Sequence, residues 1–361
     1  MSEIRSMLVD TVSKVLKDLC TKELIAAAEK GEFPARLWNT LEELGVTAVG
    51  ISEEKGGAGG GLGDFMALVK LAGYYAAPVP LAENILSNIA LEKSSLPISG
   101  QISTFSFEND IDFDKADSGW VLSGTAKYVP WARNAKTITV LGKTFKNKRM
   151  IANVSLDNCD VRPHDNLAGD PRDEVLLNQI RLNAHEVMDI NKGMISELSD
   201  LAALTRVMLM AGALERTLEL SVMYTKERTQ FGRPIGKFQA VQQKLAVLAG
   251  ETTASLAVAN FIIANIDSEI STDETAMAKI QLGDAAEAAS RIAHQVHGAM
   301  GFTDEHPLHQ STRRLWSWRD EFGSESLLAK QLGQRILEHS QDLWGFITKA
   351  PGIKAKKTGP C

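Results

Sequence analysis

Apolar residues recur every three or four positions in the first quarter of the chain. This spacing runs from Met7 to Leu16 and again from Leu37 to Leu44, and both segments are predicted to be amphipathic helices. Gly45 is expected to end the second helix, because glycine readily adopts the left-handed conformation of a helix C-cap. A further apolar helix is predicted from Asp64 to Tyr75. We therefore expect a helical domain over residues 1–96.

The pattern changes between residues 97 and 197, where apolar residues form short runs rich in β-branched and aromatic side chains. The runs are Ile102–Phe107, Trp120–Leu122, Thr137–Leu141 and Met150–Val154, and Gly, Asn, Asp and Pro separate them. Such runs and separators are typical of strands in a sheet. We predict a small β domain over residues 97–197.

Helical spacing returns over residues 198–348. The predicted helices are Asp200–Arg228, one that begins near Phe238, one that begins at the capping box Ser271–Glu274, and Leu327–Leu343. Long helices with short connections predict an antiparallel four-helix bundle. Residues 349–361, rich in Lys, Gly and Pro, are predicted to be disordered. The order helix, sheet, helix predicts an α+β multidomain fold and excludes a doubly wound α/β fold, in which the elements alternate.

Composition narrows the class of protein. The net charge of -6 argues against nucleic-acid binding, which needs a basic surface. Three cysteines, far apart, are too few for a disulfide framework or a zinc ribbon. The N-terminus lacks the apolar core of a signal peptide. No apolar run approaches the roughly 18–20 residues of a membrane span. We therefore expect a reduced, cytoplasmic protein that binds neither nucleic acid nor membranes.

Two features look like ligand sites but have structural interpretations. The glycine cluster Gly56–Gly63 contains no G-x-G-x-x-G or P-loop pattern and follows no clear strand, so we predict a flexible connection. The histidine pairs His294/His297 and His306/His309 are each three residues apart. No cysteine or paired carboxylate completes a metal-binding set around them, and we expect no metal site.

Two other segments carry more polar and aromatic side chains than helix packing needs. Residues 228–243 read RTQFGRPIGKFQAVQQ, and this segment could meet a pyrophosphate, a ribose and a flat ring. Residues 294–308 read HQVHGAMGFTDEHPL, and their glycines allow a helix end to approach a backbone or a phosphate closely. Either segment alone is also compatible with a plain helix connection.

Together, in this order and about 65 residues apart, the two segments resemble the acyl-CoA dehydrogenase family. The likeness extends over nearly the whole chain. Residues 38–59 resemble the family's N-terminal helical domain, and Leu122–Pro130 resembles the strand pair beside the flavin. The resemblance implies a helix–sheet–helix subunit, usually of a tetramer, with FAD across a subunit boundary. It also implies oxidation of an acyl-CoA substrate to its 2,3-enoyl-CoA, with electron-transfer flavoprotein as the acceptor.

Carried over position by position, the resemblance implies an FAD site built from both segments. Arg228 would face the pyrophosphate, which suits a guanidinium because it offers several parallel charge-assisted donors. Gln230 and Phe231 would lie beside it, and Phe238 and Gln239 fall where the family contacts the adenine end.

The neighbouring subunit would complete this FAD site. The resemblance assigns that part to Gln295, Gly298 and Ala299, although a glycine is commoner than Ala299 there. Two more candidates are Val129, in the strand pair beside the flavin, and Ser324, in the turn that follows the expected catalytic residue.

The catalytic base of the family has no counterpart at either of its usual positions. The reaction removes the weakly acidic α-proton of the thioester while the β-hydrogen leaves as hydride, so it needs a carboxylate base. In most members this base is a Glu whose position falls on Phe322. Some relatives place it on the first long helix of the bundle, near Ala202. Both residues are apolar here.

Three explanations stay open. Glu321 or Asp320 could act as a displaced base, or could only form ion pairs with Arg313, Arg314 or Arg319. Alternatively, a different subunit of a mixed assembly supplies the base, which is the form that we prefer. Finally, the chain could be a non-catalytic structural subunit, and a flavin oxidase on the same fold is a further alternative.

A second departure from the family lies in the β domain. A T-E-P-x-x-G-S-D stretch usually contacts the flavin and the acyl-CoA there, but this region reads Phe105–Asp112, FSFENDID. The resemblance therefore gives no forecast of the acyl pocket.

Overall fold

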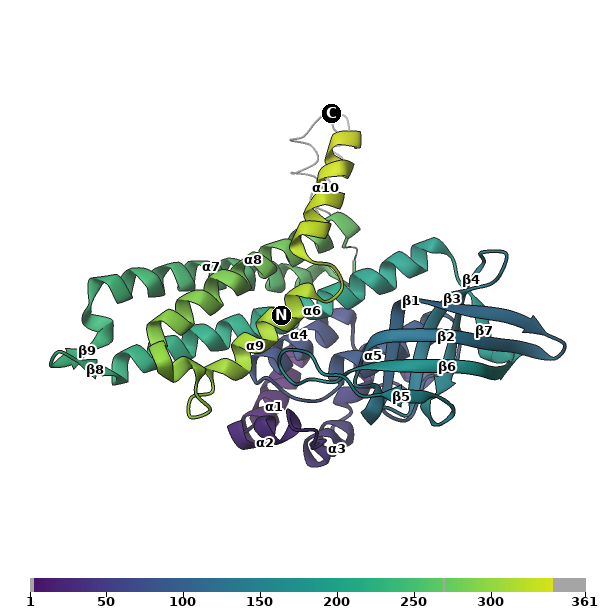
Figure 1. The fold of residues 1–361 in the computed structure, drawn as a ribbon, viewed down its shortest axis with the longest axis horizontal. Helices are drawn as coiled ribbons and strands as arrows, with labels where there is room; N and C mark the ends of the chain where they lie inside the picture. Colours follow the sequence, from purple (N-terminus) through teal and green to yellow (C-terminus); the bar gives the residue numbers. More distant parts are fainter. Residues whose placement is uncertain (1–2, 269, 340–361) are drawn as a thin grey trace.

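The protein is described by a computed structural model over residues 3–268 and 270–339. Helices come first, a seven-stranded sheet follows, and a second set of helices ends the described chain (Figure 1). This order confirms the α+β architecture that the hydrophobic pattern predicts. The predicted disordered tail, residues 349–361, lies outside the described residues.

Five α-helices form the N-terminal part. The sequence pattern predicted α1, α3 and α4 but missed α5, whose residues from Leu81 to Leu91 are all buried. A helix buried on every side has no polar stripe and therefore no amphipathic period. Gly45 ends α3 as predicted, in the left-handed conformation with φ of 70°. The helices are α1 Glu3–Leu19, α2 Lys22–Ala28, α3 Ala35–Glu43, α4 Leu62–Tyr74 and α5 Leu81–Lys93.

The glycine cluster after α3 forms a tight loop whose two ends lie side by side. Ile51 and Gly59 form an isolated antiparallel bridge, and Gly56, Gly59 and Gly60 have positive φ. A Cβ at Gly57 would collide with the backbone of Ile51. The glycines are therefore explained by tight backbone geometry.

The β part is one sheet with its own hydrophobic core. Its strand order is β5-β6-β2-β1-β3-β4-β7, and every pairing is antiparallel except that of β1 with β3. The inner face buries Phe113, Leu122 and Ile138 in a cluster separate from the main core. The strands are β1 Ser103–Ala116, β2 Gly119–Pro130, β3 Thr137–Lys143, β4 Arg149–Ser155, β5 Asp160–Arg162, β6 Arg172–Asn183 and β7 Val187–Asp189.

The C-terminal part contains one helix more than predicted. The extra helix is α9, in which polar residues interrupt the apolar side: Gln310, Ser311, Thr312 and Arg314 are buried together with Leu308, Leu315 and Trp318. Ser271 caps α8 through the expected capping box. The elements are α6 Lys192–Glu227, β8 Thr229–Gln230, β9 Arg233–Pro234, α7 Gln239–Asn265, α8 Thr272–His297, α9 Leu308–Asp320 and α10 Glu325–His339.

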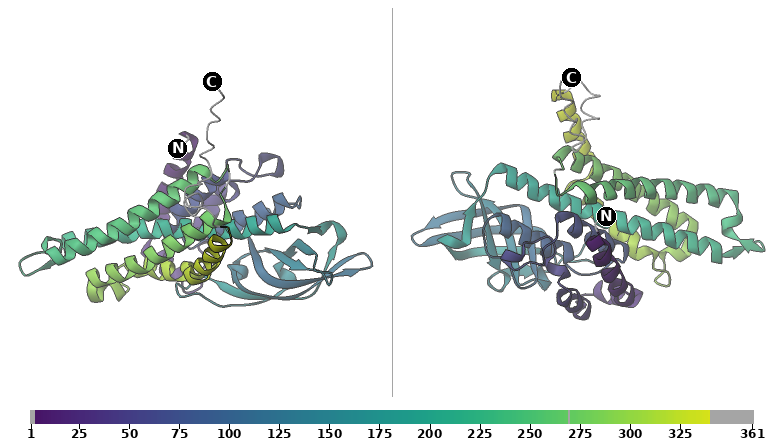
Figure 2. Two further views of the ribbon diagram at one scale, coloured as in Figure 1. Left: turned by 90° about the horizontal axis from the view of Figure 1, so that it is seen from above. Right: turned by 180° about the vertical axis from the view of Figure 1, so that it is seen from behind.

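Helix α6 connects the two regions that matter for the site. Its N-terminal half packs against α4 and contacts β1, and its C-terminal end carries the β8–β9 hairpin away from the sheet (Figures 1 and 2). Helices α7, α8 and α9 pack alongside it, and α10 leaves the bundle across α8. The sheet and the hairpin thus lie at opposite ends of the molecule.

Helix α7 is more apolar than the sequence expectation allowed. Among the described residues it is the one helix that is long and apolar enough, by length and composition, to cross a membrane. Only 33% of its apolar window is buried inside the chain. The core helix of a soluble protein passes the same test, so length and composition alone do not make α7 a membrane span.

Candidate active site

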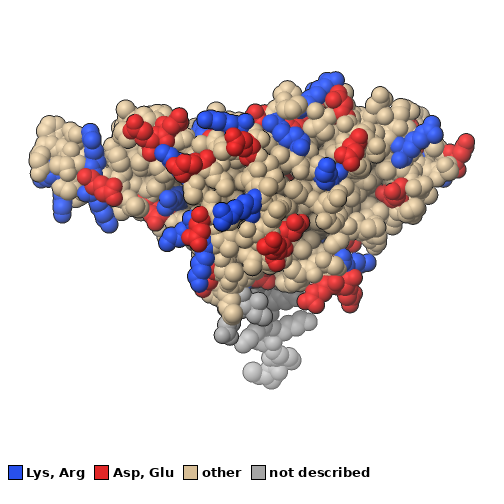
Figure 3. All heavy atoms as spheres, turned by 90° about the horizontal axis from the view of Figure 1, so that it is seen from below, with Lys and Arg blue, Asp and Glu red and all other residues tan. Residues whose placement is uncertain are grey.

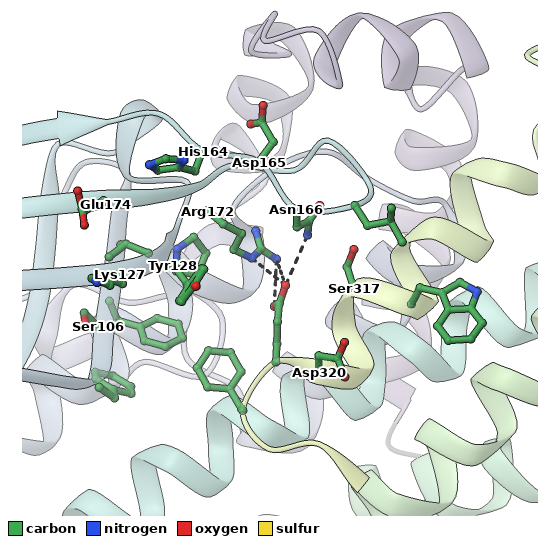
Figure 4. Close-up of a pocket in the computed structure, with 18 residues that line it drawn as sticks. Ser106, Lys127, Tyr128, His164, Asp165, Asn166, Arg172, Glu174, Ser317 and Asp320 are labelled. Carbon is green, nitrogen blue, oxygen red and sulfur yellow. Dashed lines mark hydrogen bonds and ion pairs between the residues drawn. The ribbon is translucent and has the colours of Figure 1, made fainter. Parts of the chain in front are cut away.

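A cavity of about 950 Å³ opens between one end of strands β1, β2 and β6 and the C-terminal end of α9 (Figure 4). One wall comes from β1 and β2 and includes Phe105, Phe107 and Tyr128. The opposite wall is the last turn of α9 and the residues that follow it. Residues 164–167 and Arg172 close the third side. The cavity therefore lies where the sheet, the bundle and a connecting loop meet.

The strand pair that resembled a flavin contact does line this cavity. The pairing of β2 with β6 shifts register between Ala126 and Val129, which marks a bulge. Tyr128 lies in the bulge with φ of 56° and a 79% exposed side chain. Left-handed backbone at a tyrosine is uncommon and concentrates at functional sites. The bulge places an aromatic ring at the mouth of the cavity, with Val129 in its wall.

Two arginines and two glutamates form an inner charge network, in which Arg172 and Glu321 line the cavity whereas the buried Arg206 and Glu83 do not. Arg172 donates to both carboxylate oxygens of Glu321, at 2.8 and 3.0 Å. Arg206 donates to Glu321 at 2.6 Å and to Glu83 at 2.9 Å. Asn166 adds a longer contact to Glu321, and the dashed lines in Figure 4 mark these interactions around Arg172 and Asn166.

This network makes Glu321 a poor proton acceptor. Burial alone would raise the pKa of Glu321, but the guanidiniums of Arg172 and Arg206 outweigh burial and lower that pKa to about 2. A general base works best when its pKa lies near the working pH. Asp320 is exposed at the edge of the cavity. A catalytic role for Glu321 or Asp320 stays a prediction, and the geometry favours Glu321 as an ion-pair partner.

The expected ion-pair partners of Glu321 were wrong. Arg313 and Arg314 pair with Glu29, and Arg319 pairs with Glu287 and Glu325. The physical reason is that α9 ends at Asp320 and Glu321 is extended, with ψ of 136°. This turn directs the Glu321 side chain away from the α9 arginines and toward α6.

Both family positions for the base are apolar and packed in the folded chain. Phe322 has φ of 55°, and its ring lies 5.6 Å from that of Phe105. The Arg206 guanidinium lies 5.0 Å from the centre of the same ring. Ala202 is fully buried one turn before Arg206 on α6. Neither position places a carboxylate at the cavity.

Eight of the ten predicted FAD contacts lie together at the opposite end of the bundle. The last turns of α6 and α8 meet there, because Tyr224 stacks on His297 with ring centres 4.4 Å apart. Lys244, near the start of α7, donates a hydrogen bond at 2.5 Å to Gln295, near the end of α8. Basic side chains gather at this end (Figure 3, left). The eight residues are Arg228, Gln230, Phe231, Phe238, Gln239, Gln295, Gly298 and Ala299.

The side chains of this bundle end are suited to a phosphate and a flat ring. Arg228 is exposed, and within the described residues its guanidinium has no ion-pair partner. Phe231 is 92% exposed at the hairpin tip and meets Phe238 edge to face, with ring centres 6.1 Å apart. An unpaired guanidinium and an exposed phenylalanine ring fit the nucleotide half of FAD.

The other two predicted contacts, Val129 and Ser324, lie near the cavity. Val129 lines it, and Ser324 follows Phe322 at the start of α10. Arg206 and Arg228 are 22 residues apart on or just beyond α6, which corresponds to roughly 33 Å at 1.5 Å per residue. A single dinucleotide cannot touch both ends. The ten predicted contacts therefore do not form a single site within this chain.

The histidines near the bundle end are engaged in packing. His294 shares a hydrogen bond with Thr312 at 2.8 Å, and His297 with the Ala293 carbonyl at 2.7 Å. Within residues 3–268 and 270–339, no group of three or more His, Cys, Asp or Glu side chains could hold a metal ion.

The sequence analysis did not identify Arg172, Arg206 and Glu83, which form the charge network around Glu321. A signal for Arg206 was present: it is the one charged residue in the otherwise apolar or neutral run from Leu201 to Ala213. A charge within a buried helical stretch needs a partner. The partners themselves come from α5 and from the end of α9, and no sequence spacing links these elements.

Comparison with known proteins identifies the family. Residues 2–93 match the family profile described as acyl-CoA dehydrogenase, N-terminal domain, and residues 192–337 match the profile of the C-terminal domain. The chain belongs to the acyl-CoA dehydrogenase family. The resemblance that was based on the two C-terminal motifs is thereby confirmed.

Individual relatives agree with this assignment. Acyl-CoA dehydrogenase IpdE2 of Mycolicibacterium smegmatis is 29% identical over 318 residues, which are 85% of this chain and 91% of the relative. Probable acyl-CoA dehydrogenase YngJ of Bacillus subtilis is 28% identical over 344 residues, 84% of this chain and 90% of the relative. The ChsE4-ChsE5 complex from Mycobacterium tuberculosis has the same fold, with a TM-score of 0.83 and 23% identity over 94% of this chain and 98% of that one.

Proposed function

We propose that this chain is one subunit of a mixed FAD-dependent acyl-CoA dehydrogenase that converts an acyl-CoA to its 2,3-enoyl-CoA. The observation that carries the proposal is the missing base. Phe322 and Ala202 fill both family positions, and the adjacent Glu321 is held by two guanidiniums. A homologous partner chain then supplies the carboxylate that removes the α-proton.

FAD, when bound, accepts the β-hydrogen as hydride. This chain contacts two FAD molecules, one at its own cavity and one at its bundle end. Its bundle end offers Arg228, Gln230 and Phe231 to a cofactor whose flavin lies in the partner's cavity. Gln295, Gly298 and Ala299 lie at the same end of the same chain, so we propose that they join Arg228 in that contact.

The uncovered face of α7 supports an assembly. Six of its exposed residues are apolar or small and recur every three or four positions along one side of the helix, and Gln242, Gln243, Thr253 and Asn260 are exposed as well. Small side chains allow helices to pack closely, and an apolar helix face of this length is stabilised by burial against another chain. The α7 outer face consists of Val247, Gly250, Ala254, Ala257, Phe261 and Ala264.

The assembly is tested by placing a charge in the centre of the α7 outer face. Ala257→Arg is expected to shift the protein to smaller species in size-exclusion chromatography with light scattering, because the arginine cannot be desolvated without a partner. Ala184→Arg is the matched control, since Ala184 is also exposed but lies in a turn beside the sheet. Equal behaviour of the two variants would remove α7 from the interface.

The proposed acceptor of the electrons is electron-transfer flavoprotein, and the proposed location is the cytoplasm. Three alternatives are distinguishable. A homo-oligomer would use Glu321 or Asp320 as its base. A structural subunit would bind no FAD. A flavin oxidase would be reoxidised rapidly by air.

The decisive experiment is an absorbance spectrum of the purified chain followed by an anaerobic acyl-CoA titration. We expect flavin that no acyl-CoA bleaches, and bleaching once the chain is co-purified with a homologue that has Glu at the position of Phe322. Bleaching by the chain alone would overturn the mixed-subunit proposal. Glu321→Gln and Asp320→Asn would then show which carboxylate acts, because the variant that lacks the base keeps FAD but loses bleaching.

A further inference from the structure

The two family positions for the base locate the point where the acyl group would have to react. A carboxylate at Phe322 or at Ala202 serves the same reaction, so the α-carbon of the substrate must lie between these two residues. Ala202 and Arg206 are four residues apart on α6 and therefore project from the same side of the helix. In this chain the space between them is occupied.

The occupant is the Arg206 guanidinium. It lies 5.0 Å from the centre of the Phe322 ring, one turn beyond Ala202, and the residue is fully buried. Glu83 on one side and Glu321 on the other hold it at 2.9 and 2.6 Å. Thr205 accepts a further hydrogen bond from it at 3.2 Å. A side chain fixed by three partners cannot be displaced by an alkyl group, which offers no hydrogen bond in return.

Aromatic rings close the space that Arg206 does not fill. Phe105 and Phe107 stack with ring centres 4.4 Å apart, and Phe322 lies 5.6 Å from Phe105. Phe105 is 1% exposed although it lines the cavity. The cavity is therefore open toward the solvent and closed toward α5 and α6.

We propose that Arg206 closes this chain's own cavity to the acyl chain, so that any CoA thioester bound here keeps its acyl group outside the bundle. This inference rests on the proposed function and deepens it. The chain then lacks a base and also lacks space for the reacting carbon, and dehydrogenation takes place only in the partner's cavity. Arginine remains protonated and cannot replace the base.

Chain-length dependence of binding tests the closure without any turnover. The FAD-loaded full chain is titrated calorimetrically with CoA, butyryl-CoA and octanoyl-CoA. We expect the wild type to bind all three with affinities within about threefold of one another. Each methylene that is buried contributes about fourfold in affinity, from about 0.8 kcal/mol per CH₂. A preference of tenfold or more for octanoyl-CoA in the wild type would overturn the closure.

The opening variant is Glu83→Gln with Arg206→Met, in which Glu321 keeps its pair with Arg172. We expect it to prefer octanoyl-CoA over butyryl-CoA by at least tenfold. The matched control is Asp170→Asn with Arg314→Met. It also removes a buried arginine between two acids, and Glu29 keeps its pair with Arg313. An opening variant without a length preference, or a control that gains one, would overturn the assignment to Arg206.

If the opening variant fails to fold, Phe322→Ala replaces it, because this change enlarges the same space from the other side and leaves the ion pairs intact. The flavin titration of the chain alone decides the proposed function separately: bleaching overturns the mixed subunit, whereas a length preference without bleaching overturns only the closure. Absence of binding by every CoA probe in every variant overturns the closure, because this cavity then takes no CoA thioester at all, and the flavin titration still decides the mixed subunit.

Discussion

The two ends of α6 present arginines in opposite states. Arg206, beside the cavity, is fully buried and held by Glu83 and Glu321. Arg228, beyond the last turn, is exposed, and the described residues offer it no ion-pair partner. A buried guanidinium must be neutralised within the chain, whereas an exposed one is available to a ligand. The comparison shows that the end predicted to bind FAD keeps its arginine available, whereas the cavity end uses its arginine within the chain.

Removing the buried arginine is the strongest test of this difference between the two ends. Arg206→Met is expected to lower the free energy of unfolding by about 3–5 kcal/mol, because Glu83 is left buried without its partner. Urea unfolding at pH 7 measures this loss. The double variant Glu83→Gln with Arg206→Met should recover a large part of it. A loss below about 1 kcal/mol in the single variant would mean that the network is solvated and not buried.

The exposed arginine should behave in the opposite way. Arg228→Ala is expected to weaken FAD binding by about 1.5–3 kcal/mol, the contribution of one hydrogen bond to a charged group, with little change in stability. Titration of the apoprotein assembly with FAD gives the affinity, and urea unfolding gives the stability. Lys226→Ala, two residues away at the same exposed end, is the control. Undiminished FAD affinity would remove Arg228 from the site.

Low pH distinguishes the two ends further. The pKa of Glu321 is lowered from 4.5 to about 2, so the unfolded chain binds the proton more readily than the folded one. The stabilisation is complete above about pH 4.5 and is lost as the pH falls toward 2. Glu321→Gln should therefore flatten the pH dependence of unfolding in this window. Glu174→Gln, which removes a more exposed ion pair with Arg162, should leave the dependence unchanged.

The bundle end should respond at higher pH and more weakly. Burial, with added repulsion from His297, His309 and Arg216, lowers the pKa of His306 from 6.5 to about 4. The unfolded chain takes up this proton first, so stability falls as the pH drops from about 6.5 to 4. His306→Asn keeps an acceptor for the Leu308 amide and should reduce that slope. The exposed His185→Asn serves as the control, and an equal reduction there would refute the assignment to His306.

Much of the fold was readable from local patterns. The helices with a polar stripe and the main strands were predicted because their period of 3.6 or 2 survives in the sequence. Helix α5 was missed because burial on every side removes the period, and α9 because polar residues interrupt its apolar side. The eight bundle-end residues could be grouped in advance because each of the two motifs is contiguous in sequence.

The charge network beside the cavity could not be predicted from local sequence patterns. Glu83, Arg172, Arg206 and Glu321 lie on α5, β6, α6 and the end of α9, and the chain brings them together only when the sheet packs against the bundle. The expected ion pairs of Glu321 with neighbouring arginines were wrong for the same reason, since proximity in sequence does not fix the direction of a side chain after a helix ends.

The sequence by itself determined the family, the order of helices and strands, and the absence of a carboxylate at Phe322 and Ala202, because motif residues and their spacing are properties of the chain. Only the tertiary structure decided that Glu321 is neutralised by arginines and that Arg206 fills the space between the two base positions. It also decided that the residues predicted to contact FAD lie at two distant ends. These results depend on distances between elements far apart in sequence, and such distances are set by packing.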